Sequence, residues 1–160
     1  MGLFANLFAR GEPVLSEATS RDAAAIAALH AASFRRGWSE QEVEGLLTDR
    51  HVIAHRAMDA ANMAAFIMSR RVEDEAEILS VAVARARQGR GLARNLLTLH
   101  LRLLAGLGAR AVFLEVDEHN TAAIRLYDRA GFREITRRPN YYPGAGGKAA
   151  AALVLRRDLV

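Results

Sequence analysis

Residues 79–97 read LSVAVARARQGRGLARNLL and join an apolar run to a basic, glycine-containing turn and an amphipathic segment. The apolar run over residues 78–83 is short and rich in β-branched side chains, which predicts a buried strand. Leucines then recur at helical spacing, namely Leu92, Leu96, Leu97, Leu101 and Leu104. The stretch therefore predicts a strand, a tight turn and the start of a helix.

The turn has the chemical properties that a pyrophosphate group needs. Gly89 and Gly91 allow the backbone to approach a ligand closely, and the first turn of the following helix offers unpaired N–H groups at the positive end of its dipole. Arg87, Arg90 and Arg94 add positive charge. Glycines also occur in such turns for purely steric reasons, so a structural role remains open. Neither a Gly-x-Gly-x-x-Gly loop nor a P-loop ending is present.

Length and composition favour one domain. The 160 residues, 51% of them hydrophobic, predict a single domain over residues 12–160 behind a short apolar arm, residues 1–11. The arm is too short to cross a bilayer and lacks the features of a signal peptide, so we expect no membrane association. The absence of cysteine excludes disulfides, thiolate metal ligands and a cysteine acyl-enzyme, and it fits a cytoplasmic protein.

The net charge of +4 comes almost entirely from arginine. This suits phosphate-rich ligands or a partner associated with nucleic acid, and it equally suits an arginine-biased genome. The arginines are spread along the chain and no nucleic-acid motif is present, so we expect no direct nucleic-acid binding.

Helices and strands are predicted to alternate along the chain. Capping residues mark three helix starts: Ser20, Ser39 with Glu42 in a capping box, and Asn120. The helices are expected over residues 20–30, 39–48, from the Gln88 turn to residue 106, and 120–130. Strands are expected over residues 14–18, 51–58, 63–71, 78–83, 111–116, 132–137 and 151–159. This order predicts an α/β fold, with a mixed, mostly antiparallel sheet flanked by helices.

Two polar residues stand out in these elements. Glu115 lies in an apolar strand, where a carboxylate is costly unless it is at an open face or paired. Burial would make it a stronger base, although the residues alone slightly favour an ion pair with an arginine. Tyr127 lies about two turns into the helix capped by Asn120, where a tyrosine is usually part of the core. His51 and His55 are four residues apart in a predicted strand, so we expect no metal site.

Several motifs resemble the GNAT family of N-acetyltransferases. The family pattern Gln/Arg-x-x-Gly-x-Gly/Ala after an apolar strand matches Gln88-x-x-Gly91-x-Ala93. The likeness is nearly continuous over residues 81–143 and is greatest to the RimI type, bacterial enzymes that acetylate the N-terminal alanine of a small-subunit ribosomal protein. It is also carried by Trp38-Ser39-Glu40, Met63-Ala-Ala-Phe66, Val81-Ala-Val83, Leu114-Glu-Val116, Asn120-x-Ala-Ala-Ile-x-Leu-Tyr127, Gly131-Phe132 and Asn140-Tyr-Tyr-Pro143.

The resemblance implies the GNAT acyl-CoA N-acyltransferase fold and a set of site residues. Acetyl-CoA would be the co-substrate, with no metal, and acetyl transfer would be direct in a ternary complex. Glu115 would be the general base, acting through water, and Tyr127 the general acid at the cofactor sulfur. The strand backbone at residues 81–83 would pair with the pantetheine arm and polarise the thioester carbonyl. The implied cofactor-binding residues are Val81, Ala82, Val83, Gln88, Gly89, Arg90, Gly91, Leu92, Ala93, Arg94 and Asn120.

The implied acceptor is the N-terminal α-amine of a protein or peptide, an alanine on a small-subunit ribosomal protein. An α-amine, with a pKa of about 8 against about 10.4 for lysine, needs only a modest base. In this interpretation Trp38, Tyr141 and Tyr142 form the walls of a peptide slot. In the alternative interpretation the three aromatic side chains only pack in the protein. The chain has Ala149 and Ala150 where the family usually has an acidic pair. Two alternatives remain open: acetylation of a lysine or a small-molecule amine, and a non-catalytic acyl-CoA-binding role.

Overall fold

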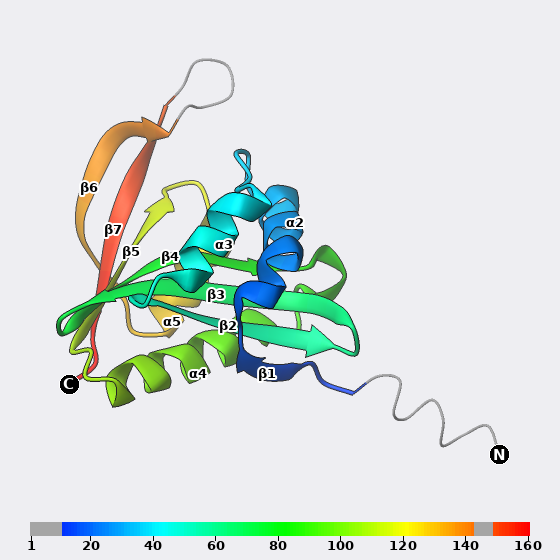
Figure 1. Cartoon of the computed structure of the whole chain (residues 1–160). Coiled ribbons are helices and arrows are strands. Elements are labelled where there is room, and N and C mark those ends of the chain that lie inside the picture. Colours follow the sequence, from blue (N-terminus) through cyan, green and yellow to red (C-terminus); the bar gives the residue numbers. More distant parts are fainter. Residues whose placement is uncertain (1–10, 143–148) are drawn as a thin grey trace.

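The computed structural model describes residues 11–142 and 149–160, which form one sheet in the strand order β1-β2-β3-β4-β5-β7-β6 (Figure 1). The strands are β1 (Val14–Glu17), β2 (Val52–Asp59), β3 (Asn62–Val72), β4 (Glu75–Val83), β5 (Ala111–Asp117), β6 (Arg133–Tyr142) and β7 (Ala150–Asp158). The helices are α2 (Ala23–Ser33), α3 (Glu40–Thr48), α4 (Leu92–Gly106) and α5 (Thr121–Arg129), with 3₁₀ turns η1 (Ser20–Asp22) and η2 (Arg85–Arg87).

The sheet consists of two antiparallel halves joined by one parallel contact. Strands β1 to β4 pair in sequence order, and β7 lies between β5 and β6. The parallel contact joins β4 to β5 over three residue pairs, from Glu75 opposite Ala111 to Glu77 opposite Phe113. The prediction of a mixed, mostly antiparallel α/β fold is confirmed.

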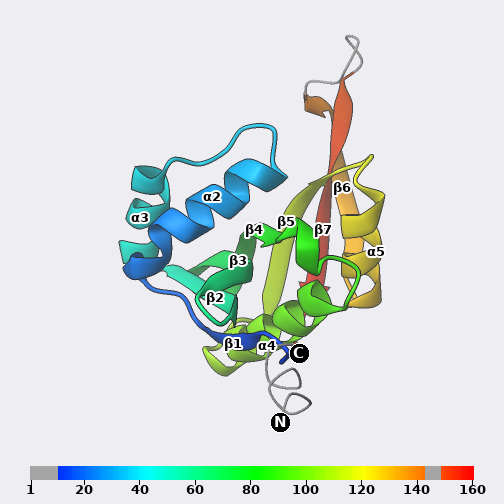
Figure 2. The ribbon, with the colours of Figure 1, turned by 90° about the vertical axis from the view of Figure 1, so that its right-hand side faces the viewer.

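Helices cover both faces of the sheet (Figure 2). On one face, here called the α4–α5 face, buried leucines of α4 and Tyr127 of α5 pack on strand residues that include Ile67, Leu114 and Val116. On the other, the α2–α3 face, Ile26 and Val43 belong to a core with residues of β2, β3 and β4. The sheet thus separates two cores, and its strands alternate their side chains between them.

Two helix starts were predicted correctly and one was not. The capping box is confirmed, because the Glu42 N–H donates to Ser39 Oγ at 3.1 Å and the Ser39 N–H donates to Glu42 Oε2 at 2.7 Å. Asn120 likewise caps α5. The assignment of Ser20 as a cap is wrong. Thr19 is the cap, with Asp22 completing the box, and η1 precedes α2. Thr19 and Ser20 are both good caps, and the acidic residue three positions later favours Thr19.

The bounds of several elements also differ from the prediction, including the end of α2 at Ser33 instead of residue 30. Strand β4 begins at Glu75 rather than at residue 78, because Glu75 and Glu77 are exposed and alternate with buried positions. Strand β6 continues to Tyr142 although it contains Pro139, which an edge strand tolerates. Helix α4 begins at Leu92 instead of Gln88, since η2 and the glycine turn come first.

A buried polar network links α4 to the sheet. His55 Nδ1 of β2 lies 2.7 Å from His100 Nδ1 of α4, and His100 Nε2 lies 2.6 Å from Ser69 Oγ of β3. All three side chains are buried. One Nδ1 must donate to the other, so the pair needs at least one unprotonated ring nitrogen. Burial lowers the pKa of both histidines, and that of His100 falls to about 3.

We expect this network to make folding stability depend on pH. Because the pKa of His100 is lower in the folded chain than its ordinary value near 6.5, its stabilising contribution is complete above pH ~6.5 and is lost as the pH falls below it. At pH 5 the free energy of unfolding should be about 2 kcal/mol lower than at pH 7.5 from His100 alone, because this histidine is protonated in the unfolded chain and neutral in the folded one. Urea unfolding at pH 7.5 and pH 5 measures the effect.

Matched variants separate His100 from other titrating groups. A His100→Gln variant should lose much of this pH dependence even if it is less stable overall. A His51→Gln variant makes the same substitution at a half-exposed histidine and controls for the loss of a histidine as such. Equal pH dependence in the wild type and His100→Gln would contradict the assignment.

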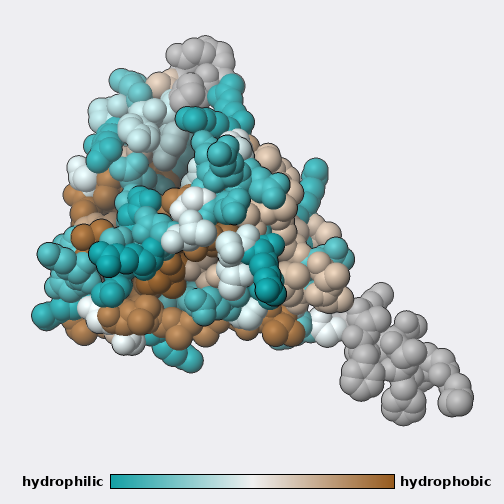
Figure 3. Space-filling model, in the orientation of Figure 1, coloured by the Kyte–Doolittle hydropathy of each residue, from teal (hydrophilic) through white to brown (hydrophobic). Residues whose placement is uncertain are grey.

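The described residues contain no group of three or more His, Asp or Glu side chains that could hold a metal ion. Within the same residues, no helix has both the length and the apolar character required to cross a lipid bilayer. Polar side chains cover much of the face shown in Figure 3, and apolar side chains gather along its lower edge, where α4 lies.

Candidate active site

Strands β4 and β5 separate beyond their short contact. Their pairing ends at Glu77 and Phe113, although β4 stays paired with β3 as far as Val83 and β5 stays paired with β7 as far as Asp117. The facing edges, residues 78–83 of β4 and 114–117 of β5, therefore pair with no strand among the described residues. We call this place the β4–β5 opening. Its free backbone N–H and C=O groups suit an extended ligand.

A β-bulge explains why the strands separate. Met68 of β3 is opposite Ser80, whereas the next residue, Ser69, is opposite Ile78. Leu79 is therefore an extra residue on β4. A bulge bends its strand and increases the local twist, and this one lies just beyond the last β4–β5 pair.

The turn after β4 leaves the start of α4 open. Gly89 and Gly91 have φ of 76° and 77°, which side-chain-bearing residues rarely adopt. Gly91 is the N-cap of α4 and has no side chain to bond the first N–H groups, and the first turn contains no acidic residue. Side chains cap η1, α3 and α5 at the corresponding place. The N–H groups at the start of α4 are thus available to an anion.

The polar side chains of the turn are of two kinds: some are exposed and available to a ligand, and others are bonded within the protein. Arg90 and Arg94 are exposed, whereas Arg87 forms an ion pair with Asp59. The Gln88 amide donates to the Val83 carbonyl at 3.1 Å and so braces the turn. Positive charge for an anion therefore comes mainly from Arg90 and Arg94.

Several predicted cofactor residues offer a ligand only their backbone. Leu92 is buried in the α4–α5 core, and Ala82 is buried in the α2–α3 core. Val81 and Val83 pack against the α4–α5 core. Asn120 Oδ1 accepts a hydrogen bond from the N–H at position 123 at 3.2 Å, so its side chain serves as a helix cap. Ala93 is half-buried in the first turn of α4.

Glu115 lies at the opening on the α2–α3 face. Its neighbours Leu114 and Val116 point into the α4–α5 core, so the alternating Glu115 side chain points the other way. Glu115 Oε1 is 3.2 Å from Arg138 Nη1 of β6, and the two side chains are 25% and 58% exposed. The ion pair that the residues favoured is present. A partly exposed pair of this kind contributes little to stability, about 0–1 kcal/mol.

Tyr127 lies on the opposite face. Its ring packs edge to face against Phe132, with centroids 5.6 Å apart, and the residue is only 7% exposed. Burial raises the pKa of Tyr127 to about 12, so the hydroxyl keeps its proton at neutral pH. No other described residue forms a hydrogen bond with this hydroxyl. Glu115 and Tyr127 are thus separated by the sheet, and the β4–β5 opening is where both faces can be reached.

The three predicted aromatic residues fall into two groups. Tyr141 and Tyr142 pack edge to face on β6 with centroids 5.1 Å apart. Burial raises the pKa of Tyr142, and so does the negative charge of the Glu115 carboxylate. Tyr142 therefore lies near Glu115. Trp38 lies instead before α3, and no contact between it and the tyrosines occurs among the described residues.

His30 of α2 fixes the position of Trp38, although the sequence did not identify His30 as a site residue. The two rings stack with centroids 4.0 Å apart, and the Trp38 N–H donates to His30 Nδ1 at 3.1 Å. Burial lowers the pKa of His30, which keeps this nitrogen free to accept. Nothing in the sequence pairs a helix-terminal histidine with a residue eight positions later.

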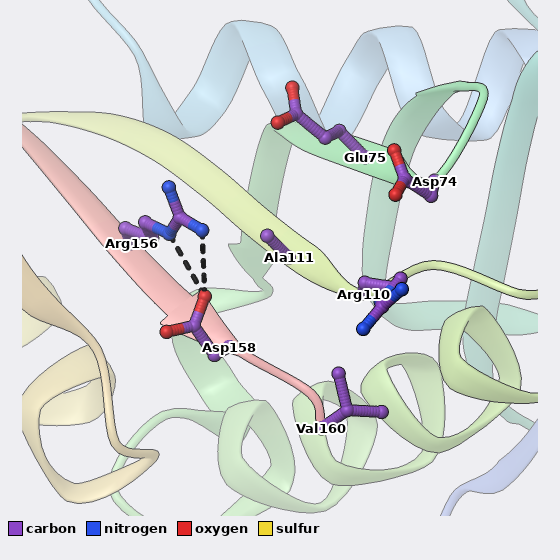
Figure 4. A pocket seen from close by; sticks show the side chains of 7 residues that line it. All are labelled: Asp74, Glu75, Arg110, Ala111, Arg156, Asp158 and Val160. Atoms are coloured by element: carbon purple, nitrogen blue, oxygen red, sulfur yellow. Dashed lines mark hydrogen bonds and ion pairs between the residues drawn. The ribbon is translucent and has the colours of Figure 1, made fainter.

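Two cavities lie outside the β4–β5 opening, the second of them beside the start of α4. One of about 220 Å³ lies at the end of the sheet where β4 and β5 are still paired (Figure 4). Acidic and basic side chains line it, and its Arg156 and Asp158 bond each other at 2.9 Å. The second, of about 230 Å³, lies between the start of α4 and residues 11–15 and is lined by Arg87 and Arg90. Neither contains Glu115 or Tyr127.

Comparison with known proteins identifies the family. The sequence model described as the acetyltransferase (GNAT) family matches residues 23–132. A Salmonella typhimurium protein named [ribosomal protein bS18]-alanine N-acetyltransferase is 39% identical over 117 residues, which cover 73% of this chain and 78% of that one. A Haemophilus ducreyi protein of the same name is 39% identical over 94 residues, 59% of this chain and 65% of its own.

A solved structure of a protein with the same described activity as these relatives also matches this chain. The ribosomal-protein-S18-alanine N-acetyltransferase of Escherichia coli superimposes with a TM-score of 0.85 and 30% identity, over 91% of this chain and 93% of that one. The family match extends from α2 to the residue before β6 and so includes the opening, the glycine turn, Glu115 and Tyr127. The chain belongs to the acetyltransferase (GNAT) family.

Proposed function

We propose that this protein transfers the acetyl group of acetyl-CoA to the N-terminal α-amine of a protein, and that the acceptor is the N-terminal alanine of ribosomal protein bS18. The observation that carries the transfer reaction is the β4–β5 opening, which leads to the uncapped start of α4. The acceptor is supported by the names of the relatives in Salmonella and Haemophilus. A ribosomal acceptor would place the reaction in the cytoplasm.

The residues present fit acetyl-CoA, which supplies an activated acetyl thioester. The N–H groups at the start of α4, together with Arg90 and Arg94, would hold the diphosphate. The unpaired edge of β4 at Val81, Ala82 and Val83 would bond the amide groups of the pantetheine arm as an added strand would. A backbone N–H on the same edge would polarise the thioester carbonyl.

The two faces of the opening would then have separate tasks. Glu115, on the α2–α3 face, would accept the proton that the attacking amine loses, through a water molecule. Tyr127, on the α4–α5 face, would donate a hydrogen bond to the sulfur as it leaves. With a pKa of about 12, its phenol is a weaker acid than a thiol of pKa near 8.5. Donation to the sulfur is therefore favoured over early proton transfer.

The acceptor would enter from the α2–α3 face, between Trp38 and the tyrosine pair Tyr141 and Tyr142. This side already carries Glu115, and Tyr142 lies near that carboxylate. Ala149 and Ala150 at the start of β7 offer no carboxylate to the acceptor, so recognition would depend on other groups. Residues 143–148 lie outside the described residues.

Mass spectrometry of two peptides incubated with the protein and acetyl-CoA tests the proposal. One peptide has a free N-terminal alanine, and the other is N-terminally blocked and contains an internal lysine. We expect a gain of one acetyl group on the first alone. A gain on the second alone would transfer the function to lysine acetylation. No gain on either would favour a small-molecule amine or a non-catalytic acyl-CoA-binding role.

The glycine turn gives a prediction for cofactor binding. Gly91→Ala should raise the KM for acetyl-CoA about tenfold, because a side chain at φ 77° strains the N-cap by about 1–2 kcal/mol. The control Gly45→Ala adds the same methyl group to a helical glycine of α3 that has open space around it. Steady-state kinetics should show an unchanged KM in that control. A wild-type KM in Gly91→Ala would argue against backbone binding at this turn.

A further inference from the structure

Ser80 has a hydroxyl with nothing to bond. Among the buried side-chain oxygen and nitrogen atoms of the described residues, Ser80 Oγ is the only one without a hydrogen-bond partner. The residue is 6% exposed. Buried polar groups are nearly always paired, so an unpaired hydroxyl needs an explanation. The sequence shows the same anomaly, since Ser80 is the one polar residue in the apolar run 78–83.

The bulge in β4 decides where this hydroxyl points. Before the bulge, Ile78 packs into the α4–α5 core, and after it Val81 does so. An unbroken strand would place Ser80 on the same face as Ile78. Because Leu79 is an extra residue, Ser80 is instead opposite Met68, which packs in the α2–α3 core. The bulge thus places the hydroxyl on the α2–α3 face.

Ser80 shares that face with Glu115. Both residues lie on the edges that border the β4–β5 opening, Ser80 on β4 and Glu115 on β5. Ser80 immediately precedes the segment 81–83 that would bond the pantetheine arm. The Tyr127 ring packs in the core on the other face. The unpaired hydroxyl and the carboxylate are therefore both on the side from which the acceptor would approach.

We propose that Ser80 Oγ accepts a hydrogen bond from the amino group of the acceptor and so orients it toward the thioester. A neutral amine has N–H groups to donate and one lone pair for attack, so bonding an N–H to Ser80 leaves the lone pair free. The serine keeps its proton and forms no covalent bond. Ser80 is thus a positioning residue. This inference rests on the proposed function for the presence of an amine acceptor.

Ser80→Ala tests the inference through a combination of effects that a structural role does not produce. The KM for the acceptor peptide should rise about tenfold, as expected for one hydrogen bond lost in a buried site, and the KM for acetyl-CoA should stay unchanged. The melting temperature should stay the same or rise, because no partner in the protein loses a bond. Ser80→Thr, which keeps the hydroxyl, should recover most of the acceptor affinity.

Ser69→Ala is the matched control. Ser69 is also a buried serine and lies on the neighbouring strand, but its hydroxyl bonds His100 on the α4–α5 side. This variant should lower the melting temperature and leave the acceptor KM unchanged. An unchanged acceptor KM in Ser80→Ala, or equal changes in the KM values of both substrates, would overturn the inference.

A failure of the Ser80 inference can be distinguished from a failure of the proposed function. If the wild type acetylates only the lysine peptide or a small amine, the proposed acceptor is wrong, and the Ser80 variants are measured on that acceptor with the same criteria. If no amine is acetylated, there is no acceptor for Ser80 to orient, and the inference fails together with the proposed function. Whatever the acceptor, a lower melting temperature in Ser80→Ala would show that the hydroxyl has a partner within the protein and would overturn the inference.

Discussion

Tyr127→Phe should lower kcat about 100-fold and leave the KM for acetyl-CoA within about twofold of the wild type. The substitution removes only the hydroxyl, so the ring keeps its edge-to-face contact with Phe132. If the hydroxyl bonds the sulfur as it becomes a thiolate, its loss affects the transition state more than the bound ground state. Steady-state kinetics with acetyl-CoA and an alanine peptide would measure both constants.

Stability measurements make this result interpretable. No described residue forms a hydrogen bond with the Tyr127 hydroxyl, so Tyr127→Phe should unfold at the same urea concentration as the wild type or at a higher one. A variant with normal stability and unchanged turnover would remove Tyr127 from the mechanism. A variant that loses both stability and activity would indicate that the hydroxyl has a structural partner.

Glu115→Gln should lose activity mainly at low pH. At pH 6.5 most of an α-amine with a pKa of about 8 is protonated, and the enzyme must remove a proton before attack; we expect a loss of about 100-fold in kcat/KM. Above pH ~8 the amine is already neutral, so the loss should diminish. The measurement is the pH profile of kcat/KM for the alanine peptide in the wild type and the variant.

The ion pair with Arg138 supplies the control. If Glu115 serves only as the partner of Arg138, then Arg138→Gln should reduce activity as much as Glu115→Gln does. If Glu115 is the base, Arg138→Gln should retain most activity and the wild-type pH profile. A Glu115→Gln profile parallel to that of the wild type would count against the base assignment even if its rate is low.

Signals confined to a few neighbouring residues predicted local structure well. The capping box at Ser39 and the cap at Asn120 depend on residues three positions apart, and both occur as expected. The glycine turn followed by a leucine-rich helix was likewise recognisable from local spacing. Thr19 shows that adjacent capping residues compete for one helix start, and that Asp22, three positions after Thr19, decides between them by completing the capping box.

Features that depend on contacts between distant residues could not be predicted. The bulge at Leu79 exists only relative to the register of β3, and the pairing of Glu115 with Arg138 requires β6 to lie near β5. The network of His55 and His100 joins residues 45 positions apart in the sequence. Ser80 combines both cases: its polarity was visible in the sequence, but its face and its lack of a partner follow from the bulge.

The short parallel contact between β4 and β5 has a consequence for substrate-dependent stability. Only three residue pairs join the two halves of the sheet along this seam, and the rest of each facing edge lacks a ladder. A ligand that bonds the edge of β4 would act as a temporary strand and add hydrogen bonds that the free protein does not have. Since such a ligand binds the folded chain alone, the free energy of unfolding increases with the ligand concentration, logarithmically once the opening is nearly fully occupied. Acetyl-CoA would then stabilise the folded protein as well as serve as its co-substrate.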